Sequence, residues 1–344
     1  MTSTTAACSS VELAGRRVAV LSGGRSTERE VSLVSGAAIG RALSAAGDGR
    51  GPARVVAVEI QPDGLWRVEG ARPCGASEAI AKAAVDVWFL ALHGGEGEDG
   101  RIQALLAASN AAHTGTGTRG SALAMDKSAA RAGAARAGLR VPNGFEWRRG
   151  EALDTARSTA VRGATGWFVK PVSGGSSVGA GPASSLDELE RLGASAHEFD
   201  PLVLVEERLE GTEASVGVLE LEGVDVCALP PIEIRPRKAH FFDYDEKYAP
   251  DGALELCPAE SLSTAALGEL QRAAVVAHRV LRAEGYSRSD FLVQGDDVVF
   301  LELNTLPGFT DRSLVPQEAA ALGVDYRSLC LAIAADGLER GVRR

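Results

Sequence analysis

The sequence predicts an α/β protein with two or three domains. The chain has 344 residues, and about 100–200 residues per domain is usual. Apolar residues make up 45% and charged residues 24%, which is the balance of a globular protein with a buried core. Short apolar runs alternate with segments whose apolar residues recur at helical spacing, and this alternation is typical of parallel sheets covered by helices.

The first part of the chain shows this alternation most clearly. Residues 17–21 form a short apolar run before a Ser-Gly-Gly turn, which predicts a buried strand. Residues 27–43 carry apolar side chains at helical spacing, with Ser26 or Thr27 as the expected N-cap. Strands at 54–59 and 85–92 and a helix at 102–109 are expected next. Together they predict a parallel sheet over about the first 120 residues.

The rest of the chain predicts two further groups of elements. Residues 125–139 are rich in Ala and Arg and predict a helix, while Ser185 opens a capping-box pattern. The other expected elements are strands at 167–170 and 202–205, a hairpin of 215–221 with 224–229, a helix at 262–283, and strands at 289–293 and 298–303. We therefore place domain limits near 125 and 212, which gives the ranges 1–125, 126–212 and 213–344.

Charge and cysteine content exclude several classes of protein. The net charge of −10 argues against a nucleic-acid binder, because phosphate contacts need clustered Lys and Arg. Five scattered cysteines without CxxC spacing indicate reduced thiols. No apolar run approaches the roughly 18–20 residues that span a bilayer, and the N-terminus lacks the charged start of a signal peptide. We expect a cytoplasmic protein with no nucleic-acid or membrane partner.

Two short glycine patterns match other enzyme classes. Residues 115–120 match GxGxxG, but they lie far from the first predicted strand, where a dinucleotide-binding fold needs that pattern. Residues 175–179 match GxSxG, which would make Ser177 the nucleophile of a serine esterase, with Asp243 and His278 as its partners. The esterase remains a distant alternative at this stage.

Two predicted neighbouring strands carry groups suited to a metal–phosphate site. Glu302 and Asn304 are two residues apart and so project from one face of a strand, as do Arg288 and Asp290. Two carboxylates and an amide oxygen suit Mg²⁺. A pair of such ions about 3.5–4 Å apart can neutralise a triphosphate. The alternative is a hairpin with solvated acids at its rim.

Two further segments are suited to holding a nucleotide. Lys170 leaves a strand and enters a Gly/Ser loop, whose backbone N–H groups can cradle phosphate beside the lysine charge. Glu206 follows another strand at the link between two predicted domains, where an acid and backbone amides can contact adenine and ribose. Each segment alone is equally consistent with a solvated loop or linker.

Seven blocks of sequence, in this order along the chain, resemble the D-alanine–D-alanine ligases of the ATP-grasp superfamily. The blocks are 21–32, 91–100 with Gln103, 121–127, 170–171 with 175–179, 242–248, 288–290, and 302–310 with 313–316. The resemblance implies a three-domain ATP-grasp architecture with an N-terminal parallel α/β domain and two domains that hold ATP between them. It implies that ATP phosphorylates one D-alanine, and that the amine of a second D-alanine displaces phosphate.

The resemblance also implies roles for individual residues. The catalytic residues are Glu28, Ser176, Tyr248, Arg288, Gly308 and Ser313, with Glu28, Ser176 and Tyr248 forming a hydrogen-bonded triad. The ATP contacts are Lys127, Lys170, Ser177, Glu206, Leu209, Glu213, Phe241 and Lys247. The two D-alanines are held by Glu28, His93, Arg288, Gly308, Ser313 and Leu314. Two Mg²⁺ ions, with Mn²⁺ as a possible substitute, are held by Asp290, Glu302 and Asn304.

The choice of second substrate is the open question. Tyr248 stands in a Glu-Lys-Tyr context that favours an amine nucleophile, whereas ligases that use D-lactate tend to carry a histidine in that role. Glu207 and Arg208 depart from the lysine and apolar residue common in the family. The alternative is an ATP-grasp ligase that joins other D-amino or D-hydroxy acids in an antibiotic or depsipeptide pathway. The family also implies a homodimer.

Overall fold

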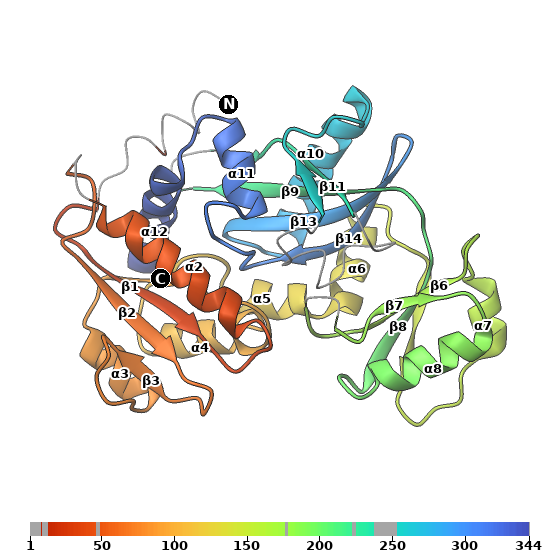
Figure 1. Ribbon diagram of the computed structural model, residues 1–344, viewed down its shortest axis with the longest axis horizontal. Helices are drawn as coiled ribbons and strands as arrows, with labels where there is room; N and C mark the ends of the chain where they lie inside the picture. Colours follow the sequence, from red (N-terminus) through yellow and green to blue (C-terminus); the bar gives the residue numbers. More distant parts are fainter. Residues whose placement is uncertain are drawn as a thin grey trace.

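The computed structural model describes residues 8, 13–45, 49–175, 178–221, 225–236 and 253–343. Three β-sheets follow one another along the chain, and helices pack against each of them (Figure 1). The first sheet lies at one end of the molecule, the second at the other, and the third between them. This arrangement confirms the predicted α/β class.

The first sheet has the order β3-β2-β1-β4. Strands β1 (Arg17–Gly23), β2 (Arg54–Ile60) and β4 (Val87–Leu90) are parallel, as predicted, and β3 (Trp66–Val68) adds an antiparallel edge. Every residue of β4 is buried, as expected for a parallel strand covered on both faces. Helices α3 (Ala76–Ala83) and α4 (Arg101–Ala108) follow β3 and β4 in the chain.

The start of the first long helix differs from the prediction. Helix α2 (Arg29–Ser44) has Glu28 at its N-cap position, without a capping hydrogen bond from that side chain. The expected cap was Ser26 or Thr27, and this was wrong. The Ser26 hydroxyl instead donates to the His93 carbonyl at 2.6 Å, so it ties the loop before α2 to the loop after β4.

Asp126 divides the segment between the first and second sheets. Helix α5 (Thr118–Met125) ends before it and α6 (Lys127–Arg136) begins after it, because the Asp126 carboxylate accepts the Ala129 N–H at 2.9 Å. The predicted helix at 125–139 is therefore correct in type but begins two residues later. The cap places Lys127 at the first position of α6.

The second sheet has the order β5-β8-β6-β7 and is antiparallel throughout. Its strands are β5 (Gly144–Arg148), β6 (Trp167–Pro171), β7 (Gly181–Ala183) and β8 (Leu202–Glu207). The capping pattern at Ser185 opens α8 (Leu186–Ala196), which packs on β6 and β7, while α7 (Thr155–Ala160) lies between β5 and β6 in the chain. The turn between β6 and β7 contains the glycine-rich segment.

The third sheet has the order β12-β11-β9-β13-β14, with β10 also paired to β9. Its strands are β9 (Thr212–Glu220), β10 (Cys227–Ala228), β11 (Ile232–Arg235), β12 (Leu254–Leu256), β13 (Gly285–Gln294) and β14 (Asp297–Asn304). The predicted hairpin after 215 is confirmed as β9 and β10, although β10 is short.

Alternation along β9 separates the core face of the third sheet from its functional face. Ala214, Val216 and Val218 are buried in one core with α10 (Thr264–Val280). Ser215 and Gly217 face the opposite side, where α11 (Leu314–Ala321) packs on β9.

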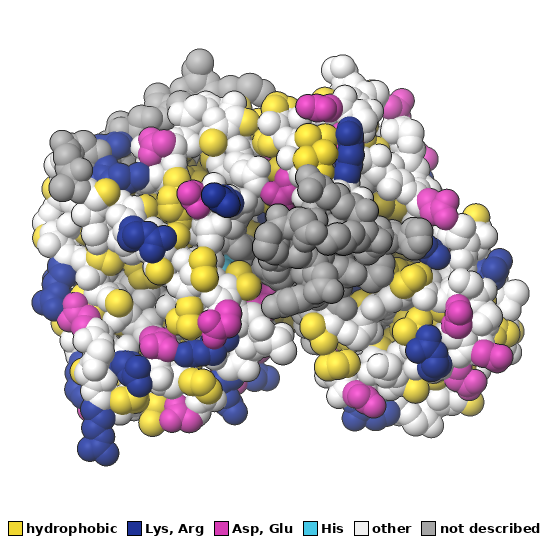
Figure 2. Space-filling view, viewed as in Figure 1, with side chains coloured by type: hydrophobic (Ala, Val, Ile, Leu, Met, Phe, Trp, Pro, Cys, Tyr) yellow, Lys and Arg dark blue, Asp and Glu magenta, His cyan; other side chains and the backbone are white. Residues whose placement is uncertain are grey.

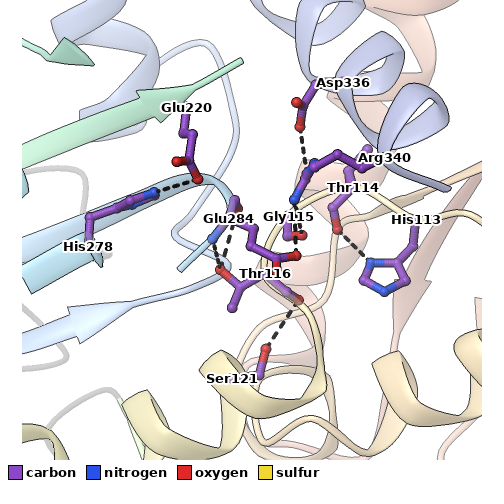
Figure 3. Close-up of polar contacts among 10 residues, drawn as sticks. All are labelled: His113, Thr114, Gly115, Thr116, Ser121, Glu220, His278, Glu284, Asp336 and Arg340. Carbon is purple, nitrogen blue, oxygen red and sulfur yellow. Dashed lines mark hydrogen bonds and ion pairs between the residues drawn. The ribbon is translucent and has the colours of Figure 1, made fainter. Parts of the chain in front are cut away.

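The C-terminal helix returns to the first sheet. Helix α12 (Tyr326–Arg343) packs against α2 and β4 (Figure 1). Arg340 on this helix pairs with Glu284 at 3.2 Å, and the Glu284 N–H donates to the Thr116 hydroxyl at 3.1 Å (Figure 3). These contacts join the segment after β4 to the start of β13. The domain limits at 125 and 212 remain a prediction.

The surface carries no strong segregation of charge on the face shown in Figure 2, where acidic and basic side chains are interspersed. A notch at the lower edge of that view separates the lobes of the first and second sheets. All five cysteines are free thiols. In the part of the chain that the structure describes, no helix is long and apolar enough to cross a membrane.

Candidate active site

A cavity of about 390 Å³ lies between the second and third sheets. Strands β6 and β8 and the glycine-rich turn form one wall, and β9, β13 and β14 form the other. Seven residues expected to contact ATP or metal line it, namely Lys127, Lys170, Glu206, Leu209, Glu213, Asp290 and Glu302. The structure therefore brings these dispersed positions together around one space.

Four polar side chains share one face of the β13–β14 hairpin. Arg288 is the register partner of Asn304, and Asp290 is the partner of Glu302, with an irregularity directly after Asp290. Arg288 donates to both carboxylate oxygens of Asp290, from Nε at 2.8 Å and from a terminal nitrogen at 2.7 Å. Asn304 Nδ2 donates to Asp290 Oδ2 at 3.1 Å, and the Ser215 hydroxyl also donates to Asp290. The predicted pairing of the two strands is confirmed.

The donor set at the end of β14 fits a hard divalent cation. Asp290, Glu302 and Asn304 supply oxygen atoms, which Mg²⁺ prefers. Each acid is paired with a positively charged side chain. Lys127 Nζ lies 3.5 Å from Glu302 Oε2, and Arg288 forms an ion pair with Asp290 at 2.7 Å. Among the described residues, no group of three His, Cys, Asp or Glu side chains could hold a metal. A metal here would therefore need Asn304 as well as the two acids.

Glu206 pairs with two cations, of which Lys170 lines the cavity and Arg131 lies outside its lining. Its carboxylate is buried, with Lys170 Nζ 2.8 Å from Oε2 and Arg131 Nε 2.9 Å from Oε1. The Glu206 side chain therefore fixes Lys170 at the cavity, and contact of Glu206 with adenine or ribose stays a prediction. Sequence reasoning missed Arg131, although it lies on the same helix as Lys127, one turn further on.

The glycine-rich turn is anchored at its beginning. Lys127 Nζ donates to the Gly174 carbonyl at 2.5 Å. The Asp200 carboxylate accepts the Ser173 N–H and the Leu202 N–H, both at 2.8 Å. Gly174 has φ +118°, a conformation that favours glycine. Lys127 thus contacts both this turn and Glu302 across the cavity.

Glu28, at the N-cap position of α2, extends towards the glycine-rich turn. A Cβ atom at Gly94 would overlap the Glu28 carboxylate, and one at Gly175 would lie 3.1 Å from Glu28 Oε2. Both glycines therefore leave room for this carboxylate. Glu28 consequently lies beside the residue that precedes Ser176.

A second acid, Glu98, lies close to Glu28 and was not predicted as a site residue. Its Oε1 accepts the Gly94 N–H at 3.1 Å. Burial, reinforced by the charge of Glu28, raises the pKa of Glu98 to about 8, although the Gly94 hydrogen bond and Arg288 oppose the shift. The residue lies in the block 91–100, so its position in that block was the available signal.

We expect Glu98→Gln to change the pH dependence of stability. The folded protein holds a proton on Glu98 up to about pH 8, whereas the unfolded chain releases it near the ordinary glutamate pKa. Wild-type stability therefore falls as the pH rises between these values, by about 2 kcal/mol from pH 6 to pH 8. Glutamine keeps an acceptor for Gly94 and has no proton to lose. Urea unfolding at both pH values should show the variant losing less stability, and equal losses would contradict the assignment.

His93 holds the segment that contains Gly308. Its Nδ1 lies 3.0 Å from the Leu306 carbonyl and its Nε2 lies 2.9 Å from the Ser35 hydroxyl. A carbonyl only accepts, so Nδ1 carries the proton and Nε2 accepts from Ser35. Burial lowers the pKa of His93, despite the opposing effects of the Leu306 contact and Glu28. The imidazole is thus neutral and connects the first sheet to residues 306–309.

Gly308, Ser313 and Leu314 lie together at the start of α11. Ser313 occupies the N-cap position without a capping hydrogen bond from its side chain, and its hydroxyl accepts the Thr310 N–H at 2.9 Å. A Cβ atom at Gly308 would lie 3.4 Å from Ser313 Oγ. Leu314 is buried against Ile232 and Ile234 of β11. A helix N-terminus favours anions, so this corner suits a carboxylate.

Five predicted site residues lie outside the described residues: Ser176, Ser177, Phe241, Lys247 and Tyr248. Asp243 of the esterase alternative lies outside them as well. His278, its third member, is completely buried, with Nδ1 2.7 Å from the Ser287 hydroxyl and Nε2 3.4 Å from Glu220 (Figure 3 shows the second contact). His278 is therefore a buried core residue that packs beside the third sheet, and it is not available as the histidine of a serine esterase.

Comparisons with known proteins cover almost the whole chain. The family models described as D-ala D-ala ligase N-terminus and D-ala D-ala ligase C-terminus match residues 17–116 and 137–334. The D-alanine--D-alanine ligase of Halalkalibacterium halodurans is 38% identical over 315 residues, which is 91% of this chain and 96% of that protein.

Solved structures show the same fold. The D-alanine--D-alanine ligase from Bacillus anthracis complexed with ATP superposes with a TM-score of 0.77 at 24% identity, covering 96% of this chain and 99% of that one. The VanG D-Ala:D-Ser ligase from Enterococcus faecalis gives 0.78 at 27% identity, covering 94% and 99%. The ATP-grasp fold expected from the sequence is thus confirmed. The two family models and the near-complete coverage show that this chain belongs to the D-alanine–D-alanine ligase family.

Proposed function

We propose that the protein joins two molecules of D-alanine to D-alanyl-D-alanine, with hydrolysis of ATP to ADP and phosphate, to supply peptidoglycan precursors. The family assignment supports the reaction class. The observation that carries the proposal is the convergence of Lys127, Lys170, Asp290 and Glu302 on one cavity. Fixed charges of both signs are what transfer of a phosphoryl group requires.

The first chemical step is phosphorylation of a carboxylate. An oxygen of the first D-alanine attacks the γ-phosphorus, the bond to the β,γ-bridging oxygen breaks, and ADP leaves. Glu28 would hold the ammonium group of this substrate, while Lys127 and Lys170 would bind phosphate oxygens as point charges. Mg²⁺ held by Asp290, Glu302 and Asn304 would supply further neutralisation of phosphate charge. The acyl phosphate has the leaving group that a carboxylate lacks.

The second step forms the amide bond. The amine of the second D-alanine attacks the acyl carbon, the amine loses a proton, and phosphate leaves from the tetrahedral intermediate. Arg288 and the Gly308 N–H would stabilise the oxyanion, while Ser313 and Leu314 would receive the second carboxylate at the start of α11. Leu314 packs with Ile232 and Ile234, and this apolar cluster would limit the access of water to the acyl phosphate.

The experiment that tests this function uses purified full-length protein with ATP, Mg²⁺ and D-alanine. Released ADP and the dipeptide are measured together. We expect ADP and D-alanyl-D-alanine in equal amounts, both dependent on D-alanine and on the divalent cation. The absence of D-alanine-dependent ADP would overturn the proposal.

The second substrate is tested by a screen of D-alanine, D-serine and D-lactate at the second position. D-serine is included as an alternative second substrate because the chain is similar to a D-Ala:D-Ser ligase at 27% identity. We expect Tyr248→Phe, which keeps the ring and removes the hydroxyl, to lower kcat/KM for D-alanine roughly 10-fold by loss of one hydrogen bond. Unchanged kinetics with both D-alanine and D-lactate would exclude this role for Tyr248.

We further propose that the protein is cytoplasmic, because the reaction consumes ATP. We also propose that it is a homodimer, because members of this family are commonly dimers. Sedimentation equilibrium measures the assembly state directly. A dimer mass of twice 35.7 kDa is expected, and a monomer at micromolar concentration would contradict it.

A further inference from the structure

Helix α11 is joined to β9 by a buried acid that the reaction scheme does not use. Glu318 is completely buried, one turn beyond Leu314 on the same helix. Its Oε2 accepts the Gly217 N–H at 2.6 Å. The acid thus links the helix that begins at the proposed second-substrate corner to the third sheet.

The sheet leaves a place for this contact. Strand β9 pairs with β11 up to Ser215 and with β10 from Val218 onwards, so Gly217 falls between the two partners. The Gly217 carbonyl accepts the Leu229 N–H at 2.8 Å, and the Glu318 side chain supplies the acceptor for the Gly217 N–H. A Cβ atom at position 217 would overlap Glu318 Oε2. Only glycine admits the carboxyl group here.

The same position lies beside the proposed oxyanion group. Gly217 is the register partner of Arg288 across β9 and β13, and directly opposed residues project from one face of a sheet. Glu318 therefore lies on the face that carries the Arg288 side chain, close enough for the charge of each to influence the other. Burial raises the pKa of Glu318 well above its ordinary value, although the Gly217 hydrogen bond and Arg288 oppose the shift.

We propose that Glu318 is a positioning residue for the second substrate, because its bond to Gly217 fixes Ser313 and Leu314 relative to Arg288. The proposal rests on the ligase function proposed above. Another directional contact between α11 and this sheet is the Gln317 Nε2 bond to Glu255 Oε2 at 2.6 Å, which reaches the edge strand β12 and not β9. Beside β9, helix α11 also packs through apolar side chains such as Val315, whose contacts are not directional. A hydrogen bond between Glu318 and β9 fixes where helix α11 lies along the sheet. The start of α11 would in turn hold the second D-alanine, whose amine must reach the acyl carbon, and a small displacement of that amine lowers the rate.

The test compares Glu318→Leu with Glu318→Gln. Leucine retains volume and removes the acceptor, so we expect the KM for the second D-alanine to rise about tenfold, or 1.4 kcal/mol. The KM values for ATP and for the first D-alanine should stay within about twofold. Glutamine still accepts the Gly217 N–H and should restore wild-type values. Gly217→Ala, whose Cβ displaces the carboxyl group, should reproduce the leucine result even if Glu318→Leu fails to fold.

The matched control is Asp336→Asn, which alters another buried acid on a helix, paired with Arg340 at 2.5 Å. It should leave the second-substrate KM unchanged. A folded Glu318→Leu or Gly217→Ala protein with an unchanged second-substrate KM, or with all three KM values raised alike, would overturn the proposal.

A measurement without substrate separates this proposal from the function. Amide hydrogen exchange of residues 314–321 should be faster in Glu318→Leu than in wild type and unchanged in Glu318→Gln. Equal exchange in all three proteins would refute the tether. If wild type makes no dipeptide, the ligase function fails, and the exchange rates still decide whether Glu318 holds α11.

Discussion

Replacing Glu302 with alanine is expected to lower kcat by roughly three orders of magnitude while the protein remains folded. The variant removes the cavity-lining acid whose Oε2 lies 3.5 Å from Lys127 Nζ. A cation left with Asp290 and Asn304 has one protein oxygen fewer, and the Lys127 charge loses its partner. Initial rates of ADP release at saturating Mg²⁺ measure the effect, and circular dichroism checks the fold.

Asp297→Ala is the matched control for Glu302→Ala. It removes an acid from the same strand, five residues away, whose side chain is 72% exposed and pairs with Arg140 at 2.8 Å. Surface pairs of this kind contribute little, so its kcat should lie within about twofold of wild type. A folded Glu302→Ala protein with near-normal turnover would refute the metal assignment.

Arg288→Met has the second large expected effect, on both activity and stability. Its guanidinium donates two hydrogen bonds to Asp290 and is only 14% exposed. Methionine leaves the Asp290 carboxylate without its cation, which should cost about 3 kcal/mol of unfolding free energy. Loss of the proposed oxyanion donor should lower kcat by roughly 10²–10³. Urea unfolding and steady-state rates measure the two effects separately.

The double variant Arg288→Met with Asp290→Asn distinguishes the two effects. Neutralising Asp290 removes the unpaired charge and should recover most of the lost stability. The kcat should stay at or below that of Arg288→Met, because Asp290 is also a proposed metal ligand. Recovery of turnover together with stability would contradict both the oxyanion role of Arg288 and the metal role of Asp290.

The positions of the strands, and of the polar residues at their ends, could be predicted from the sequence because both depend on local periodicity. The i, i+2 spacing of Glu302 and Asn304 places them on one face of β14. In the structure, Arg288 and Asp290 lie beside them on the same face of the neighbouring strand β13. The parallel order of β1, β2 and β4 follows from alternation of strands and helices. These features need no knowledge of the tertiary fold.

Contacts between distant segments could not be predicted in this way. His93 pairs with Leu306, 213 positions further along the chain, and no local pattern reports that contact. Glu318 appears to a periodicity argument as an ordinary polar residue on a helix, because the glycine that receives it lies 101 positions earlier. Arg131 was missed for the same reason, because its partner Glu206 lies on a distant strand. Glu98 bonds locally to Gly94, but its closeness to Glu28, far away in the sequence, could not be predicted from a local pattern.

We propose that Asp290, Glu302 and Asn304 bind the cation that accompanies ATP at the third sheet. Anomalous diffraction from crystals grown with Mn²⁺ and a non-hydrolysable ATP analogue tests this most directly. We expect an anomalous peak within coordination distance of all three side chains, next to the terminal phosphates and Lys127. Phosphates bound in the cavity with the manganese peak elsewhere, and with Arg288 still bonded to Asp290 and Lys127 still beside Glu302, would contradict the proposed metal site.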